Sequence, residues 1–273
     1  MLIKKCLSNL LPPFATKYWK KKKRIYGLFG DYKNWEAACH AAMPYRTNIK
    51  AFVRLALEHY HRKELIGFRN LMPILAGLQL SGNNRVLDFG GGLGFVYFDI
   101  AHLGGIHLDS WRVVDYHDVV EYGNANYADS VLSFHSDIES ACHDTVPGLV
   151  LCAYTLQYHE NPYQNLSRLA ALQPDVFVLH GLPLAAKEKF MVQKWPPACG
   201  MVDMAVRILA ENKLSSALFG YDLISEMQLP QWDSAIGTEL VARVYRRQGF
   251  TAPAEVKGIK RLLRSHDELS RDE

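Results

Sequence analysis

Four glycines in five positions, directly after a short apolar run, constrain the fold of this chain more than any other feature. The stretch 85–94 reads RVLDFGGGLG, and an aromatic-rich apolar run follows it at 95–100. This pattern predicts a buried strand, a tight turn and a helix that begins at the carboxyl end of the strand. Glycine permits positive φ and leaves no Cβ between a ligand and the backbone. The turn, with the free N–H groups of the helix N-terminus behind it, therefore predicts a ligand site.

Three interpretations of this turn compete. The first interpretation is a nicotinamide dinucleotide site, which requires the fingerprint G-x-G-x-x-G/A. Counted from Gly90, the last glycine or alanine of this fingerprint should stand at position 95, where the chain has Phe95. A close-packed strand-to-helix corner without a ligand is the second interpretation. The spacing of Asp88, Gly90, Gly92 and Gly94 instead resembles the first motif of class I S-adenosylmethionine-dependent methyltransferases.

This resemblance implies a fold, a cofactor and a first set of site residues. The fold is α/β and Rossmann-like, with a seven-stranded, mostly parallel sheet whose last strand is antiparallel. The cofactor is S-adenosylmethionine, and the product is S-adenosylhomocysteine. In this family the acid at the strand end, here Asp88, helps to hold the cofactor ammonium. The glycines that lie against the amino-acid part of the cofactor are Gly90, Gly91, Gly92 and Gly94.

A second predicted strand, 111–115, ends in an acid 21 positions beyond Gly94. Open α/β sheets bind nucleosides at the carboxyl ends of their strands, where such an acid accepts hydrogen bonds from ribose hydroxyls. Asp115 is therefore the candidate ribose ligand, which would place Tyr116 near the adenine; an ordinary surface charge is the alternative. Asp118, one helical turn further, is interpreted as an early-helix acid.

Two later strand ends complete the predicted cofactor site. The strand at 131–134 leads to Asp137 and Ile138, and the resemblance implies that they meet the adenine amino group and the adenine ring. A helix cap after Ser136 is the alternative for Asp137. The continuously apolar run 149–152 predicts a central parallel strand. It opens into 153–162, which in this family lies beside the reactive methyl, so Ala153 is assigned to the cofactor site.

The candidate catalytic residues follow the central strands. Methyl transfer from a sulfonium is an in-line displacement, so the site must mainly position the acceptor and exclude water. A sugar hydroxyl would also benefit from a general base. His159 and His180 are candidates because histidine's ordinary pKa is near neutral. Tyr154 and Tyr158 are candidates for orienting the acceptor, and a structural role is the alternative for all four residues.

The chain before the glycine strand has helical periodicity. Apolar residues recur on one face over 49–60 and 65–78, and Pro73 is expected to kink or divide the second helix. We expect these helices to cap the ligand edge of the sheet. After a fifth strand at 176–179, the sequence predicts no regular structure over 182–197, a helix over 201–217, a turn into a strand at 219–224 and the last strand at 240–245.

Charge divides the chain unevenly. Residues 1–24 hold eight basic and no acidic residues, so the remainder has a net charge of −5 although the whole chain has +3. Together with Tyr18 and Trp19, this arm favours peripheral contact with an anionic membrane surface, and a solvated arm is the alternative. Nucleic acid is not predicted as a partner, because no binding motif accompanies the basic run. We expect four segments: a basic amphipathic arm at 1–24, a helical cap at 25–80, the methyltransferase domain at 81–255 and a charged tail at 256–273.

Composition excludes several other classes of protein. No apolar run approaches the roughly 18 residues of a membrane span. The five cysteines are odd in number and never in C-x-x-C spacing, which predicts neither a disulfide framework nor a zinc site. A cytoplasmic location fits this cysteine usage, with any membrane contact at the inner face. No carboxylate cluster predicts a metal ion.

A closer resemblance covers about residues 10–250. The pattern resembles a bacterial family of methyltransferases often linked with surface-polysaccharide or O-antigen assembly, and it rests on the stretches 27–38, 86–92, 113–115, 156–158, 207–209 and 220–223. It implies O-methylation of a saccharide or related small molecule. A small-molecule O- or N-methyltransferase of secondary metabolism and a cofactor-binding but inactive scaffold in glycan assembly are the alternatives. The acceptor and the oligomeric state stay open.

Overall fold

The computed structural model describes residues 27–42, 68–194, 203–229 and 239–251. The predicted arm at 1–24, the tail at 256–273 and the predicted helix over 49–60 lie outside these residues.

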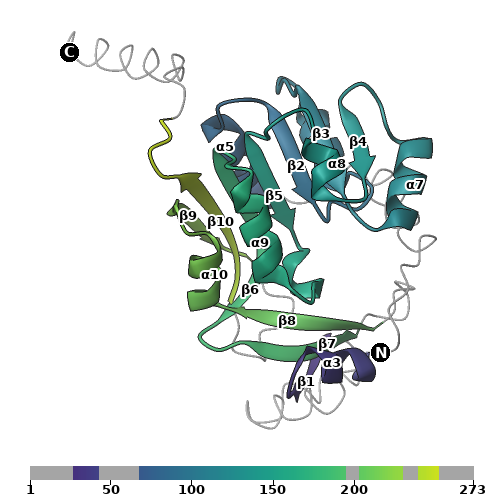
Figure 1. Cartoon of the computed structure of the whole chain (residues 1–273), viewed down its shortest axis with the longest axis vertical. Helices are drawn as coiled ribbons and strands as arrows, with labels where there is room; N and C mark the ends of the chain where they lie inside the picture. The colour runs from purple at the N-terminus through teal and green to yellow at the C-terminus, as the bar shows by residue number, and fades with distance from the viewer. Residues whose placement is uncertain (1–26, 43–67, 195–202, 230–238, 252–273) are drawn as a thin grey trace, which may run out of the picture.

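The centre of the fold is a sheet in which seven strands lie in the order β4–β3–β2–β5–β6–β10–β9 (Figure 1). The first five of these are parallel to one another, and β10 is antiparallel to both β6 and β9. The predicted sheet, mostly parallel with an antiparallel last strand, is confirmed. The strands are β2 (Arg85–Phe89), β3 (Ser110–Val114), β4 (Leu132–His135), β5 (Leu149–Ala153), β6 (Val176–Ala185), β9 (Tyr221–Gln228) and β10 (Glu239–Arg247).

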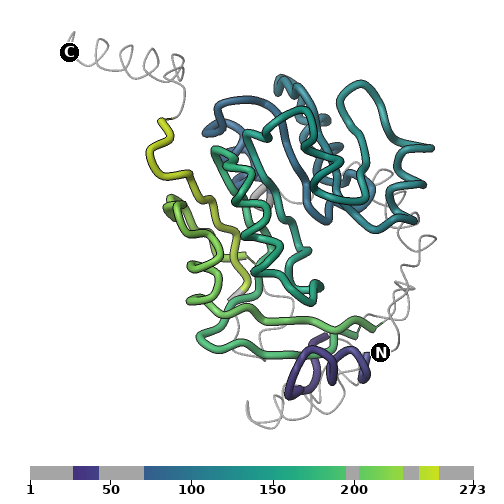
Figure 2. Tube along the Cα trace, viewed as in Figure 1, coloured from purple at the N-terminus to yellow at the C-terminus, as the bar shows by residue number. Residues whose placement is uncertain are grey.

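Helices cover both faces of this sheet, which makes three layers (Figures 1 and 2). One buried cluster joins the first face to α5 (Phe68–Leu80), α6 (Phe95–Leu103) and α7 (His117–Asn126). A second cluster joins the other face to α8 (Ile138–Cys142), α9 (Pro162–Ala171) and α10 (Glu211–Ala217).

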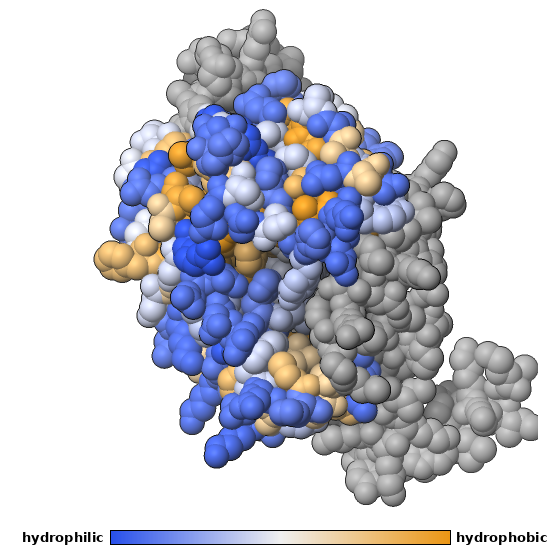
Figure 3. Space-filling model, turned by 45° about the vertical axis from the view of Figure 1, so that its right-hand side comes forward, coloured by the Kyte–Doolittle hydropathy of each residue, from blue (hydrophilic) through white to orange (hydrophobic). Residues whose placement is uncertain are grey.

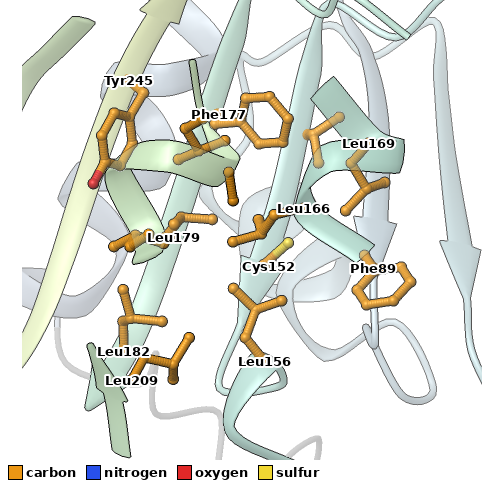
Figure 4. Packing of buried hydrophobic residues seen from close by; sticks show 14 of the residues in the cluster. Phe89, Cys152, Leu156, Leu166, Leu169, Phe177, Leu179, Leu182, Leu209 and Tyr245 are labelled. Atoms are coloured by element: carbon orange, nitrogen blue, oxygen red, sulfur yellow. The ribbon is translucent and has the colours of Figure 1, made fainter. Parts of the chain in front are cut away.

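The strand β6 shows why the central strands have apolar residues at successive positions of the sequence. Phe177 and Leu179 share one face and pack in the cluster that contains Leu166 and Leu169 of α9 (Figure 4). Val178, between them, packs in the cluster on the opposite face. Because successive side chains of a strand alternate, a strand covered on both faces is apolar at every position. Full burial of each such side chain stabilises the fold by roughly 1.5–3 kcal/mol.

Three further strands form an antiparallel ribbon that the sequence did not predict. They are β1 (Gly27–Tyr32), β7 (Lys189–Lys194) and β8 (Met204–Ala210), in the order β1–β7–β8. The strand β8 pairs with β6 at Leu184 and Ala185, where the opposite side of β6 pairs with β10. The ribbon therefore lies beyond the carboxyl end of β5, across the edge where ligands bind in such sheets (Figure 1).

A short helix closes this edge against the ribbon. The helix α3 (Trp35–Ala41) begins at Asn34, whose side chain accepts a hydrogen bond from Ala37 N at 2.9 Å. It packs on β7 and β8. Asparagine is a preferred N-cap because its side-chain oxygen satisfies an N–H group that the helix leaves open.

Two sequence predictions are wrong in this region. The predicted helix over 201–217 is helical only from Glu211, because β8 occupies Met204–Ala210. This strand is buried at all but one position, so its apolar run has no period that separates strand from helix. The stretch 182–197, expected to lack regular structure, holds the end of β6 and all of β7.

The predicted helical cap at 25–80 also needs correction. The segment begins with a strand, β1, and α5 packs against the face of the sheet rather than over its ligand edge. This helix continues through Pro73 without division. Of the described helices in this segment, α3 is the one that lies at the ligand edge.

On the face seen in Figure 3, the described residues are mostly hydrophilic, and hydrophobic side chains occur in small groups. Phe219 is the most exposed of the large hydrophobic residues, at 90%. Within the described ranges, every helix is too short or too polar to cross a membrane.

Candidate functional site

The order of the strands marks where a ligand would bind. The chain passes from β2 to β3 and β4 on one side of the sheet and from β5 to β6 on the other. Open α/β sheets bind ligands at the carboxyl ends of the strands where the order reverses in this way. The glycine turn follows β2, and the segment 154–161 follows β5, so the two predicted halves of the site meet at this point.

The glycine turn adopts a backbone that other residues rarely take. Gly90, Gly92 and Gly94 have φ values of 73°, 60° and 81°. A Cβ at Gly90 would collide with Thr155 Oγ1, and a Cβ at Gly91 would collide with the carboxylate of Asp88. The turn is therefore closely packed against Thr155 and Asp88 on its inner side, and its four glycines carry no side chain.

Asp115 fastens this turn to the neighbouring strand. Its Oδ2 accepts a hydrogen bond from Gly92 N at 2.8 Å, and its Oδ1 accepts one from Tyr116 N at 2.7 Å. Gly90 N in turn donates to Val114 O at 2.8 Å. Burial raises the pKa of Asp115, although both N–H donors favour its charged form. The structure thus brings Asp115 and the glycines together as one unit.

Asp88 lies behind the turn, where it is fully buried. Trp111 Nε1 donates to its Oδ2 at 3.1 Å, and its Oδ1 has no hydrogen-bond partner among the described residues. Burial raises the pKa of Asp88 to about 7. The backbone of Gly91 separates the carboxylate from the outer side of the turn. Direct contact with a cofactor ammonium, as the resemblance implies, stays a prediction.

Asp137 and Ile138 have structural tasks at the end of β4. Asp137 caps α8, because its Oδ1 accepts a hydrogen bond from Ser140 N at 2.6 Å. This bond holds the pKa of Asp137 below its usual range. The side chain of Ile138 is buried in the core cluster beneath α8. The helix-cap alternative thus describes the observed geometry of Asp137, and contact of either residue with an adenine stays a prediction.

Tyr154 and His180 form a pair at the ends of β5 and β6. Tyr154, which follows Ala153, has a φ of 53°, and its N–H donates to His180 O at 2.7 Å. The two rings meet edge to face at 5.2 Å, and a Cβ at Gly181 would collide with the Tyr154 ring. His180 is 4% exposed whereas Tyr154 is 41% exposed. This geometry suits His180 to supporting Tyr154 and leaves Tyr154 accessible to a ligand.

His159 is the candidate base that lies in the wall of a cavity. Its ring lies 5.0 Å from the ring of Phe89, and its Nε2 is 3.3 Å from Thr155 Oγ1. Burial lowers the pKa of His159, which favours the neutral imidazole, the form that a general base needs.

The cavity measures about 630 Å³ and lies between the sheet edge and the ribbon. The helix α3 and the strand β8 supply one side of it, and Tyr116 and the segment 158–161 supply another. Within the described chain, its wall includes the predicted residues Tyr116, Tyr158 and His159 but not Tyr154, His180 or any of the turn glycines. The described residues contain no group of three potential metal ligands.

Sequence reasoning missed the wall that α3 and β8 contribute. Its residues are Trp35, Glu36, Cys39, His40, Ala42, Met204 and Ala205. The aromatic pattern at 27–38 was a signal for the first of these, but it indicated family resemblance rather than a location. The stretch 207–209 of β8 also contributed to that resemblance without indicating a location, because the place of this strand depends on pairing with distant segments.

Arg207 of β8 supports this wall from behind. Its guanidinium donates to Glu188 Oε1 at 2.9 Å and to the backbone oxygen of Glu160 at 2.6 Å. The same group lies over the ring of Trp35, 5.4 Å from its centroid, and over that of Phe190 at 4.9 Å. The residue is 8% exposed. Arg207 therefore connects the ribbon, α3 and the segment after β5.

Replacing Arg207 with methionine is expected to lower the free energy of unfolding by about 2 kcal/mol, because it leaves the largely buried Glu188 with Lys213 as its remaining ion-pair partner and removes the hydrogen bond to Glu160 O. Urea denaturation measures the loss. Arg168→Met is the matched control, since its ion pair with Glu139 is exposed and should contribute under about 1 kcal/mol. Equal losses in the two variants would show that Arg207 does not stabilise the wall.

The sequence matches no protein-family model and no curated protein. Solved structures do match. A S-adenosylmethionine-dependent methyltransferase from Clostridium acetobutylicum ATCC 824 is 9% identical, with 74% of this chain and 100% of that chain covered and a TM-score of 0.48. One from Mesorhizobium loti is 15% identical, with coverages of 67% and 100% and a TM-score of 0.46.

A third match is the 1,6-didemethyltoxoflavin-N1-methyltransferase of Burkholderia thailandensis, solved with S-adenosylhomocysteine and 1,6-didemethyltoxoflavin. It is 16% identical, with 75% of this chain and 92% of that chain covered and a TM-score of 0.44. With identities of 16% or less and TM-scores below 0.5, these likenesses carry no argument about this chain. The strand order and the antiparallel last strand are those of the Rossmann-like class I methyltransferase fold.

Proposed function

We propose that this protein is an S-adenosylmethionine-dependent methyltransferase that methylates an oxygen of a saccharide or related small molecule. The observation that carries the proposal is the hydrogen bond from Gly92 N to Asp115 Oδ2. It holds a turn of four glycines and Leu93 against an acid of the next strand, at the point where the strand order reverses. Such a point is where nucleoside-containing ligands bind in α/β sheets.

The residues present fit this cofactor. The turn offers bare backbone to the amino-acid part, and the remaining lone pairs of Asp115 are available to ribose hydroxyls. Tyr116 is 47% exposed beside Asp115 and also lines the cavity, so an adenine there would lie at the cavity mouth. When bound, S-adenosylmethionine supplies an electrophilic methyl group on a positively charged sulfur.

The residues around the cavity would carry the remaining tasks. His159, whose pKa burial lowers, would accept the proton of the acceptor hydroxyl. The bound cofactor would supply the methyl group, whose bond to sulfur breaks as its bond to the acceptor oxygen forms, with S-adenosylhomocysteine as the leaving group. Thr155 Oγ1, 3.3 Å from His159 Nε2, orients the imidazole. Tyr154, fixed by the edge-to-face contact with His180, positions the acceptor. The cavity walls exclude water and hold the reacting atoms in line.

The acceptor class rests on two supports. A volume of about 630 Å³ is in the usual range for small-molecule sites of roughly 300–1,000 Å³. The saccharide, and the link to surface-polysaccharide assembly, rest on the sequence resemblance. Peripheral contact of residues 1–24 with an anionic membrane at the cytoplasmic face belongs to the same proposal, and the arm lies outside the described residues.

Asp115→Ala is expected to weaken S-adenosylhomocysteine binding by about 30-fold or more, because it removes ribose acceptors and the bond to Gly92, and a hydrogen bond to a charged group contributes roughly 1.5–3 kcal/mol. Isothermal titration calorimetry measures the change. Asp118→Ala is the matched control, since this acid lies in the first turn of α7 and should leave the affinity unchanged.

Two results would contradict the proposal. Tighter binding of a nicotinamide dinucleotide than of S-adenosylhomocysteine would assign the turn to another cofactor. Binding of S-adenosylhomocysteine without methyl transfer to any of a panel of saccharides and small hydroxylated acceptors would favour the inactive scaffold.

A further inference from the structure

Apart from the histidines His40 and His159, the charged side chains of the cavity wall have one sign among the described residues. Glu36 of α3 and Glu160 of the segment after β5 both line the cavity, and no lysine or arginine of the described chain does. His159 is held neutral by burial. The guanidinium of Arg207 lies over the ring of Trp35 and is paired with Glu188. The described wall is therefore acidic.

The two carboxylates stand on different walls. The backbone of Glu160 is fixed by the hydrogen bond from Arg207, while its side chain stays exposed. Partial burial and then the negative charge of Glu160 raise the pKa of Cys39 on α3, so the field of this carboxylate reaches across to the helix that carries Glu36. Neither carboxylate forms an ion pair with another described residue.

Aromatic rings complete the surroundings. Trp35, Tyr116 and Tyr158 line the same cavity as the two glutamates. The Tyr158 hydroxyl donates to Gln193 Oε1 at 2.6 Å, which fixes this side chain against the ribbon. Aromatic faces attract cations through their quadrupole, and they also pack against the apolar faces of small ligands.

We propose that the acceptor carries a protonated amino group held by Glu36 and Glu160, so that amino sugars are the substrate class of this site. The inference rests on the proposed function, because it concerns the acceptor side of the same site. A ligand that fills the cavity removes water from both carboxylates, and an uncompensated buried charge is costly. A cationic amine compensates that charge, whereas an anionic sugar or a sugar nucleotide would be repelled.

The test compares three sugars that share one ring and differ in charge: glucosamine, N-acetylglucosamine and glucuronate. Each is titrated into the full chain by saturation-transfer NMR at about pH 6.5, where the free amine is protonated, with and without saturating S-adenosylhomocysteine. We expect glucosamine to bind best. Glu36→Gln and Glu160→Gln should each weaken it on the order of tenfold, as expected for loss of a charge-assisted hydrogen bond.

The controls separate this inference from the proposed function. Glu139→Gln removes the same charge from α8, outside the cavity wall, and should leave glucosamine binding unchanged. Equal or better binding of the other two sugars, or no binding of any, would overturn the inference. So would glutamine variants that lose affinity for S-adenosylhomocysteine and keep that for glucosamine. Failure of the wild type to bind S-adenosylhomocysteine would contradict the proposed cofactor. The titrations of the three sugars without S-adenosylhomocysteine would still measure whether the cavity prefers the sugar with an amino group.

Discussion

Replacing Gly90 with alanine is expected to abolish detectable S-adenosylhomocysteine binding and to lower the free energy of unfolding by about 2–5 kcal/mol. The residue has a φ of 73°, which costs an L-residue roughly 1–2 kcal/mol. The new Cβ would also collide with Thr155 Oγ1 and Cβ, and such overpacking costs typically 1–3 kcal/mol. Relief of this collision must move the turn away from the segment after β5, so both halves of the cofactor site lose their alignment.

Gly104→Ala separates backbone strain from the collision. Gly104 has a φ of 67°, close to that of Gly90, but a Cβ there would meet no atom within 4 Å. This variant should lose only the strain energy and bind S-adenosylhomocysteine like the wild type. Urea denaturation and calorimetry measure the two quantities. If both alanine variants are equally unstable, or if the Gly90 variant keeps its affinity for S-adenosylhomocysteine, Thr155 does not pack against Gly90 as it does in the structure.

The sequence predicts the central sheet well because local patterns determine it. The apolar run 149–152 became β5, Leu149–Ala153, and the predicted strand 111–115 became β3, Ser110–Val114. Asp115 was identified by its place at a strand end, and it does lie at the glycine turn. The hydrogen bond that it accepts from Gly92 N was not predictable. No local pattern indicates which N–H group will donate to a carboxylate 23 residues away.

The position of Asp88 was within reach of sequence reasoning. In β2 it alternates with Leu87 and Phe89 and shares a face with Val86, which packs in the cluster under α5. The period of two therefore predicts that its carboxylate points toward the core. The resemblance to a family motif instead predicted a contact between Asp88 and the cofactor ammonium at the strand end.

The ribbon was not predictable from local patterns. Its pairing joins Gly27 to Lys194, and β8 to β7 and to the far end of β6. Such contacts depend on which distant segments meet in three dimensions. The wall that α3 contributes to the cavity depends on the same pairing, and for that reason Glu36 and Trp35 were not among the candidate site residues.

The free energy of unfolding is expected to fall as pH rises from about 4 to about 7, because Asp88 retains its proton in the folded state. Burial raises its pKa from the ordinary 3.8 to about 7. In that window the folded state binds more protons than the unfolded state, so each rise in pH favours unfolding. The difference between the two pKa values corresponds to a loss of roughly 4 kcal/mol across the window. Urea denaturation at intervals of pH measures it.

Asp88→Asn should remove this dependence, since the amide does not titrate. Asp137→Asn is the control with the opposite sign: the pKa of Asp137 is lowered by its bond to Ser140, so the stability it confers is lost only as pH falls below its ordinary pKa. Between about pH 5 and pH 7 that variant should keep the slope of the wild type. Parallel profiles of the wild type and Asp88→Asn would show that the buried carboxylate is already ionised.

Loss of the Asp88 proton on ligand binding would show that its carboxylate interacts with a ligand bound at the glycine turn. Its carboxylate lies directly behind Gly91, so an ammonium group bound on the outer side would favour the charged form of Asp88. Binding of S-adenosylhomocysteine near pH 7 should therefore release up to about half a proton from the wild type, because a group with a pKa of about 7 is half protonated there. Calorimetry in buffers of different ionisation enthalpy counts that proton. Asp88→Asn should release none, and an equal release from both proteins would mean that the ammonium group binds elsewhere than against this turn.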